Sequence, residues 1–238
     1  VLGGKPCRLD DDMGWLIAAV QEAAALVLAG PTYFLGPAAV IKLVLDRLLM
    51  VTGRLKDALP PAQPAVTLAV AGLQDWRGVT LPYLNALVTA FGYQSIESVN
   101  AFAPGPGEVL LDKDLMDRVF AAGRRLGRGE LERPPAAPNV CPVCRCDSFV
   151  LTESQATCPI CGQSATVELD GEAVSLRFDL DGGGSQRWTP EGLRAHMTDW
   201  VMATGPRYLA HRREIRSRRK SFRASEIDWL CPFLSEEG

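Results

Sequence analysis

Residues 24–55 constrain the fold most, because a short apolar run is followed at once by a tight loop and an apolar helix. Residues 24–29 are continuously apolar and end at a glycine and a proline, a pattern typical of a strand covered on both faces in a parallel sheet. Residues 38–51 then carry apolar side chains at helical spacing with only a narrow polar face. Strand, loop and helix make half of a βαβ unit, so we expect an α/β fold.

The loop between that strand and helix, residues 30–36, offers the groups that a flat heteroaromatic ligand needs. It follows the carboxyl end of its strand, where ligands bind in open α/β sheets. A glycine and a proline fix the turn, the backbone N–H groups of residues 32–35 can point outward, and two aromatic rings offer their faces. The candidate ligand-binding residues in this loop are Pro31, Thr32, Tyr33, Phe34 and Leu35.

This segment carries a resemblance to a known family. Gly-Pro-Thr-Tyr-Phe, followed by Leu-Gly-Pro-Ala-Ala-Val-Ile-Lys-Leu-Val-Leu-Asp-Arg, resembles the SPxYF…K…LDR segment of flavodoxin-fold NAD(P)H-dependent FMN reductases. Residues 7–13, Cys-Arg-Leu-Asp-Asp-Asp-Met, are similar to an element of the iron-sulfur flavoprotein branch. The resemblance implies a flavodoxin-like parallel sheet, FMN as cofactor, NAD(P)H as electron donor, and a homodimer that pairs through the helix at 38–51. An unrelated α/β protein with a Pro-Tyr turn is the alternative.

A second loop with matching chemistry, residues 72–78, follows an expected strand at 65–71. Its glycines allow close backbone approach, and its tryptophan can cover a ring. It resembles the glycine-rich loop that approaches the flavin in the same reductase family, which adds four candidate FMN-binding residues: Gly72, Leu73, Trp76 and Gly78. A helix at 80–91, a strand at 94–102 and a helix at 111–126 continue the alternation. No catalytic acid or base is assigned, because the flavin itself carries the chemistry.

The N-terminal part of this domain departs from the family. The resemblance implies a first strand, a phosphate-binding loop and a second strand before residue 24, and residues 1–23 have no counterpart of them. We therefore expect residues 1–128 to be a partial FMN-binding domain in an N-terminally truncated chain, which as a fragment is inactive or binds FMN poorly. The strand at 24–29 would then lie at an edge of the sheet.

A proline-rich linker, residues 129–139, leads to two CxxC knuckles, Cys141-Pro-Val-Cys144 and Cys158-Pro-Ile-Cys161. Each knuckle places two thiolates on one side of a tight turn, so two knuckles form a tetrahedral cage with the spacing of a zinc ribbon. We predict Zn²⁺ at these four cysteines. A single iron, as in rubredoxins, is the alternative; Arg145 stands where the first rubredoxin knuckle has glycine.

The predicted ribbon covers residues 140–180. Cys146 is left out of the ligand set because its C-x-C spacing from Cys144 suits a closed knuckle less well. Two alternating strands, at 165–169 and 173–178, are joined by Asp170-Gly171, which is a hairpin signal.

Residues 181–238 are expected to form a C-terminal helical extension. Residues 207–223 hold eight Lys or Arg against the single acid Glu214, a pattern that fits either a solvated helix face against the flavin domain or nucleic-acid binding. The net charge of −3 argues against a nucleic-acid partner for the whole chain. No apolar run is long enough to span a membrane, and the paired cysteines favour metal binding in a reducing cytoplasm.

Two classes of function follow. The first is an FMN-dependent NAD(P)H oxidoreductase or electron-transfer flavoprotein, in which hydride or electrons pass through flavin N5 to an acceptor that the sequence does not identify. The alternative is a zinc-ribbon adaptor, a nucleic-acid- or protein-binding module with a non-catalytic flavodoxin-like remnant. A phosphate-binding loop in the natural chain upstream would favour the enzyme.

Overall fold

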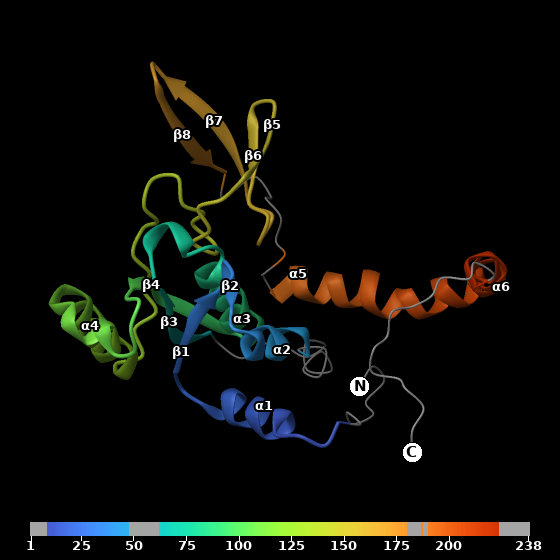
Figure 1. Ribbon diagram of the computed structural model, residues 1–238, viewed down its shortest axis with the longest axis horizontal. Helices are drawn as coiled ribbons and strands as arrows, with labels where there is room; N and C mark the ends of the chain where they lie inside the picture. The colour runs from blue at the N-terminus through green and yellow to red at the C-terminus, as the bar shows by residue number, and fades with distance from the viewer. Residues whose placement is uncertain (1–8, 48–61, 180–186, 188–189, 224–238) are drawn as a thin grey trace. The chain divides into compact units, whose positions relative to one another are not determined.

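The computed structural model describes residues 9–47, 62–179, 187 and 190–223 (Figure 1). The chain divides into two compact units, Val1–His196 and Met197–Gly238. The described part of the first unit contains two sheets, one mixed and one antiparallel. The described part of the second unit is helical.

The first sheet has the order β2-β1-β3-β4. Strands β1 (Leu26–Tyr33), β3 (Gln63–Ala71) and β4 (Tyr93–Phe102) are parallel and lie side by side, whereas the short β2 (Gly36–Pro37) runs antiparallel to β1 (Figure 1). Strands alternate with helices along the chain, so the predicted α/β fold with a parallel sheet is confirmed.

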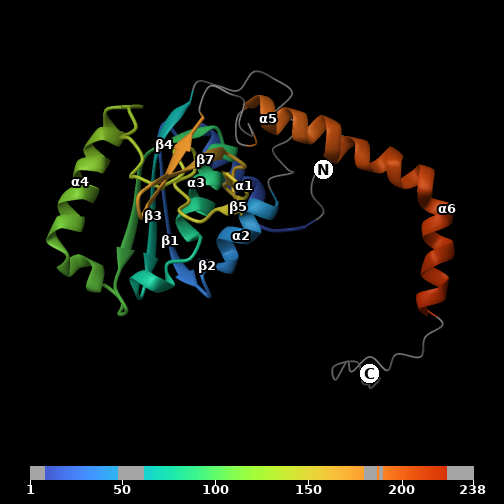
Figure 2. The same cartoon turned by 90° about the horizontal axis from the view of Figure 1, so that it is seen from above.

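Helices cover both faces of this sheet. Three of them, α1 (Met13–Glu22), α2 (Ala39–Asp46) and α3 (Thr80–Ala90), lie on one face, and α4 (Lys113–Gly127) lies on the other (Figure 2). On the first face Ala69 of β3 packs in one core cluster with α2 and α3. On the second face Val66 and Ile96 pack against Ala122 of α4. Val66 and Ala69, three positions apart on β3, thus face opposite layers, as the alternation of side chains along a strand requires.

The end of β1 differs from the predicted loop at residues 30–36. The strand continues through Tyr33, and a two-residue turn at Phe34 and Leu35 returns the chain as β2. Both turn residues have positive φ angles, 48° and 65°, which is the conformation of a tight hairpin that matches strand twist. The predicted tight loop was therefore too long: residues 30–33 belong to β1, and the turn is only two residues. The hairpin was missed because the usual Asn-Gly or Asp-Gly signal is absent from residues 34–35.

The burial of β1 also differs from the prediction. Val27, Ala29 and Pro31 are exposed, while Leu28 and Gly30 face the helices. The reason is that α4 packs over β3 and β4 and leaves this face of β1 uncovered among the described residues. The expected cover on both faces was therefore wrong for this strand. Of the helix predicted at 38–51, α2 forms residues 39–46, and residues 48–51 lie outside the described part of the chain.

The second sheet is an antiparallel meander with the order β5-β6-β7-β8. Its strands are β5 (Val150–Thr152), β6 (Gln155–Thr157), β7 (Ser164–Asp170) and β8 (Ala173–Phe178). The predicted hairpin through Asp170-Gly171 joins β7 to β8 and is confirmed. The β5–β6 hairpin was not predicted.

The C-terminal helices are α5 (Pro190–Ala195), a π-helical stretch (His196–Met202) and α6 (Ala203–Arg223). Nearly all described side chains of α6 are exposed, including its arginines. Among the described residues, no helix is both long enough and apolar enough to cross a membrane.

Candidate functional site

Most of the candidate flavin-binding residues line one cavity of about 280 Å³. They come from the β1–β2 hairpin and from the loop after β3. Because β1 and β3 are adjacent and parallel, these two connections meet at the carboxyl edge of the sheet. Six of the nine candidates line the cavity: Thr32, Phe34, Leu35, Gly72, Leu73 and Trp76.

The other three candidates lie beside the cavity lining. Tyr33 is exposed and, as the neighbour of Thr32 in a strand, points to the opposite face. The carbonyl of Pro31 accepts a hydrogen bond from the Ala38 N–H (3.2 Å), which holds the hairpin to the start of α2. Gly78 lies against the backbone of Leu35.

Close backbone packing joins the two walls of the cavity. Gly78 has a φ of 50°, and a Cβ atom there would lie 2.0 Å from the carbonyl oxygen of Leu35. That same oxygen accepts a hydrogen bond from the Val79 N–H (2.9 Å). Thr32 also donates its hydroxyl to that of Thr80 (2.8 Å), at the start of α3. Only a residue without a side chain fits at position 78.

The lining of the cavity is apolar and aromatic. Phe34 is 100% exposed and Trp76 is 56% exposed, so both rings are available to a ligand. None of the six lining residues has a titratable side chain. The cavity therefore offers ring faces, apolar contact and one threonine hydroxyl, which suits a planar ring system and supplies no acid or base of its own.

The four predicted metal ligands converge in the ribbon. The Sγ atoms of Cys141, Cys144, Cys158 and Cys161 all lie within 4.8 Å of one another, and all four residues are buried. The Cys141–Cys161 and Cys144–Cys158 sulfur pairs are each 3.4 Å apart, too far for a disulfide. A tetrahedral zinc site with bonds of 2.3 Å places its sulfurs about 3.8 Å apart. The donor set therefore fits a tetrahedral metal ion.

The remaining described cysteine, Cys146, is also buried but lies outside this group. Its thiol donates to the carbonyl oxygen of Ser148 (3.4 Å). Within the group, hydrogen bonds from the other thiols, that of Cys141 above all, lower the pKa of Cys158. The same network, with the Cys141 hydrogen bond first, raises the pKa of Cys144 and Cys161. Cys158 is therefore the member of the group that is disposed to be a thiolate, the state that a metal ion needs.

The two knuckles have the same backbone geometry. The N–H groups of Arg145 and Gly162 donate to the carbonyls of Cys141 (2.9 Å) and Cys158 (2.8 Å), respectively. Arg145 and Gly162 also both have positive φ angles, 62° and 79°. Arg145 therefore adopts the conformation of the glycine that it replaces, and its presence does not distinguish zinc from iron.

A buried asparagine that the sequence analysis missed links α3 to the first knuckle. Asn85 donates its side-chain amide to the carbonyl of Cys144 (2.9 Å) and accepts from the hydroxyls of Thr67 (2.7 Å) and Ser98 (3.0 Å). An ion pair between Arg77 and Asp147 adds a second link, from the loop after β3. The signal in the sequence was an asparagine in the middle of a largely apolar helix.

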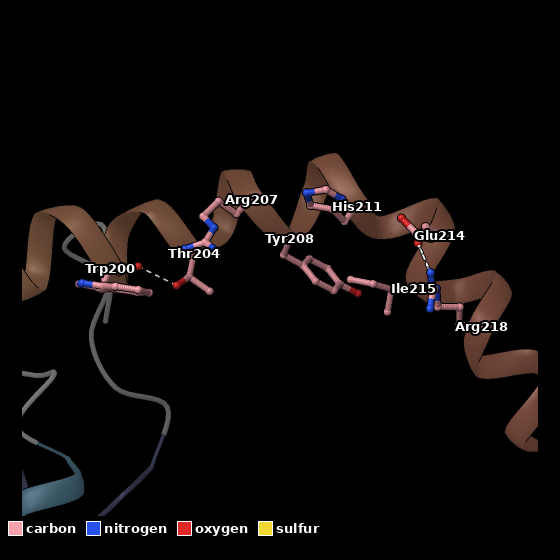
Figure 3. Close-up of a pocket in the computed structure, with 8 residues that line it drawn as sticks. All are labelled: Trp200, Thr204, Arg207, Tyr208, His211, Glu214, Ile215 and Arg218. Atoms are coloured by element: carbon pink, nitrogen blue, oxygen red, sulfur yellow. Dashed lines mark hydrogen bonds and ion pairs between the residues drawn. The ribbon is translucent and has the colours of Figure 1, made fainter. Parts of the chain in front are cut away.

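A second cavity, of about 580 Å³, runs along one face of the C-terminal helices (Figure 3). Trp200, Tyr208, His211 and Ile215 lie along this face, and Arg207 lies 5.7 Å from the centroid of the Trp200 ring. Its lining comes from this single run of helix, so it is an open groove. We assign no catalytic role to its histidine.

Comparison with known proteins finds several likenesses, the first of which covers the first sheet. Residues 2–103 match the model of the NADPH-dependent FMN reductase family. Flavone synthase cfoJ of Aspergillus candidus is 25% identical over 217 residues, which cover 80% of this chain and 67% of that protein. A solved structure of a flavone reductase has a TM-score of 0.71 and 19% identity, covering 94% of this chain and 84% of that one. This likeness shows a shared fold.

The matched region contains all nine candidate flavin-binding residues and ends before the cysteines. The family supports flavin-dependent oxidoreduction and implies a nicotinamide nucleotide as a substrate.

Proposed function

We propose that this protein binds the isoalloxazine ring of FMN at the cavity between the β1–β2 hairpin and the loop after β3. The observation that carries the proposal is that six of nine residues chosen from two separate loops line one cavity at the carboxyl edge of a parallel sheet. The family of residues 2–103 agrees with this assignment. The protein would then be an NAD(P)H-dependent flavin oxidoreductase.

Bound FMN would supply hydride or electron transfer through its N5 atom. The residues of the chain would position the ring. Phe34 and Trp76 offer faces for stacking, and Leu73 extends the apolar rim. Thr32 is held in place by its hydrogen bond to Thr80. An exposed apolar rim of this kind suits a planar aromatic electron acceptor, and the names of the two relatives make a flavone the first compound to test.

The four-cysteine cluster would hold Zn²⁺ as a structural ion in the ribbon. A closed set of four thiolates leaves no open coordination position for a substrate. Free buried thiols of this kind are stable in a reducing compartment such as the cytoplasm.

Replacing Trp76 with alanine should weaken FMN binding about two- to twelvefold, because an aromatic stacking partner contributes about 0.5–1.5 kcal/mol. FMN affinity is measured by the quenching of flavin fluorescence when the full-length protein is titrated with FMN. The activity is then measured as the oxidation of NADH and of NADPH with a flavone as acceptor. Phe120 on α4 is similarly exposed and far along the chain from both loops, so F120A is the control. Equal loss of affinity in both variants would contradict the proposed site.

The protein is also proposed to form a homodimer through α2. Val40 and Leu43 of this helix are 67% and 58% exposed, which a second subunit would cover. We expect a dimer in sedimentation at micromolar concentration and a monomer after V40E and L43E are combined. V174E, at an exposed valine of β8, should leave the dimer intact. A monomeric unaltered protein would refute this assembly.

A further inference from the structure

An arginine clamps each of the two cysteine knuckles in the same way. Nη1 of Arg133 donates to the carbonyls of Pro142 (3.0 Å) and Val143 (2.8 Å), the two residues between Cys141 and Cys144. Nη1 of Arg187 donates to the carbonyls of Pro159 (3.2 Å) and Ile160 (3.0 Å), the two residues between the second pair of cysteines. The arginines come from opposite sides of the ribbon sequence, 133 before it and 187 after it. The duplication is therefore a property of the site and not of a local sequence repeat.

The hydrogen bonds of the Arg133 guanidinium do not satisfy all of its buried N–H groups. Its Nη2 atom is buried and has no hydrogen-bond partner among the described residues. Burial and the charge of Arg145 lower the pKa of Arg133 to about 10, whereas Cys144, Cys141 and the carboxylate of Glu97 raise it. The side chain is therefore charged at neutral pH. A buried cation with an unpaired N–H group is costly unless a nearby negative charge compensates it.

The cysteine cluster would provide that charge once it is loaded. Four thiolates around a divalent ion leave two negative charges without compensation, in a site that is closed to water. A guanidinium bound to the outside of each knuckle brings positive charge close to the sulfurs and occupies none of their coordination positions. Its hydrogen bonds also hold the carbonyl groups of the knuckle in place. They therefore stabilise the turn that points the two sulfurs toward the centre of the cage.

We propose that Arg133 and Arg187 are positioning residues of the metal site, whose charges hold a divalent ion in the tetrathiolate cage. The inference rests on the proposed metal site. It adds a role for two residues outside the CxxC motifs, and it predicts that the charge of these side chains, beyond their hydrogen bonds, sets how long the metal stays bound.

The test compares glutamine and lysine at the same positions. Glutamine keeps an N–H donor and removes the charge, whereas lysine keeps both a donor and the charge. Zinc release from the full-length protein into a chromophoric chelator is followed by absorbance, after the zinc content of each variant has been measured. R133Q and R187Q should release zinc about 10- to 100-fold faster than the unaltered protein, the range found for residues that support metal ligands. R133K and R187K should release it at nearly the original rate.

The matched control is R177Q on β8 of the same ribbon, because Arg177 pairs with Glu168 and contacts neither knuckle in the hydrogen bonds of this module. Its zinc release should be unchanged. Arg187 is exposed, so R187Q tests the proposal even if the half-buried Arg133 is needed for folding. Equal rates in the glutamine and lysine variants would overturn the charge role. A metal-free unaltered protein would refute the metal site itself, which is a different result.

Discussion

Replacing Cys158 with serine should abolish metal binding and unfold the ribbon. A serine hydroxyl stays protonated at neutral pH and cannot take the place of a thiolate, so a closed tetrahedral site loses one of its four ligands. The hydrophobic core of the ribbon is small. Its buried cluster consists of five cysteines, with Phe149, Ile160 and Phe178 packed around them. Structural zinc contributes about 10–16 kcal/mol to folding in small modules of this kind.

The measurements are elemental analysis of the purified protein and amide hydrogen exchange in β7 and β8. We expect about one zinc ion per chain in the unaltered protein and none in C158S, with fast exchange of the ribbon amides. C146S is the control, since Cys146 is equally buried but its sulfur lies outside the cage. Metal retained by C158S would rule out the assigned ligand set, and iron in place of zinc would favour the rubredoxin-like alternative.

Replacing Gly78 with alanine should weaken FMN binding about a hundredfold, equivalent to about 2.8 kcal/mol. The added Cβ atom would lie 2.0 Å from the oxygen, 2.4 Å from the carbonyl carbon and 2.5 Å from the Cα atom of Leu35. These are backbone atoms, so the clash cannot be relieved by a side-chain rotation. The hairpin must move away from the loop after β3, which breaks the Val79–Leu35 hydrogen bond and opens the cavity between them.

The control for this change is G92A. Gly92 also has a positive φ angle, 89°, but an added Cβ atom there would meet nothing within 4 Å. Both variants carry the strain of a left-handed alanine, about 1 kcal/mol, and only G78A carries the clash. FMN titration and thermal unfolding of both proteins separate the two effects. Similar FMN affinities in G78A and in the unaltered protein would show that the hairpin does not form a wall of the flavin site.

The sequence by itself determined the order of the main elements and which four cysteines come together. The parallel strands, α3 and the β7–β8 hairpin follow from apolar periodicity and from glycine and proline positions, which act over a few residues. The CxxC spacing is equally local, because the turn that joins two cysteines is complete within each knuckle. The two flavin loops could be paired because each ends a strand of one parallel sheet, and this rule needs topology but no coordinates.

Only the tertiary structure decided how the two sites are supported. The turn at Phe34 and Leu35 packs against Gly78 and accepts a hydrogen bond from the Val79 N–H, more than forty residues later, so no nearby residue signals it. Asn85, Arg133 and Arg187 all bind backbone carbonyls of the knuckles. Because every residue has a backbone carbonyl group, the sequence of the knuckles does not indicate which carbonyls accept these hydrogen bonds. The paired cysteines are chemically distinctive and could be predicted, whereas the groups that hold them in place become visible only when the chain is folded.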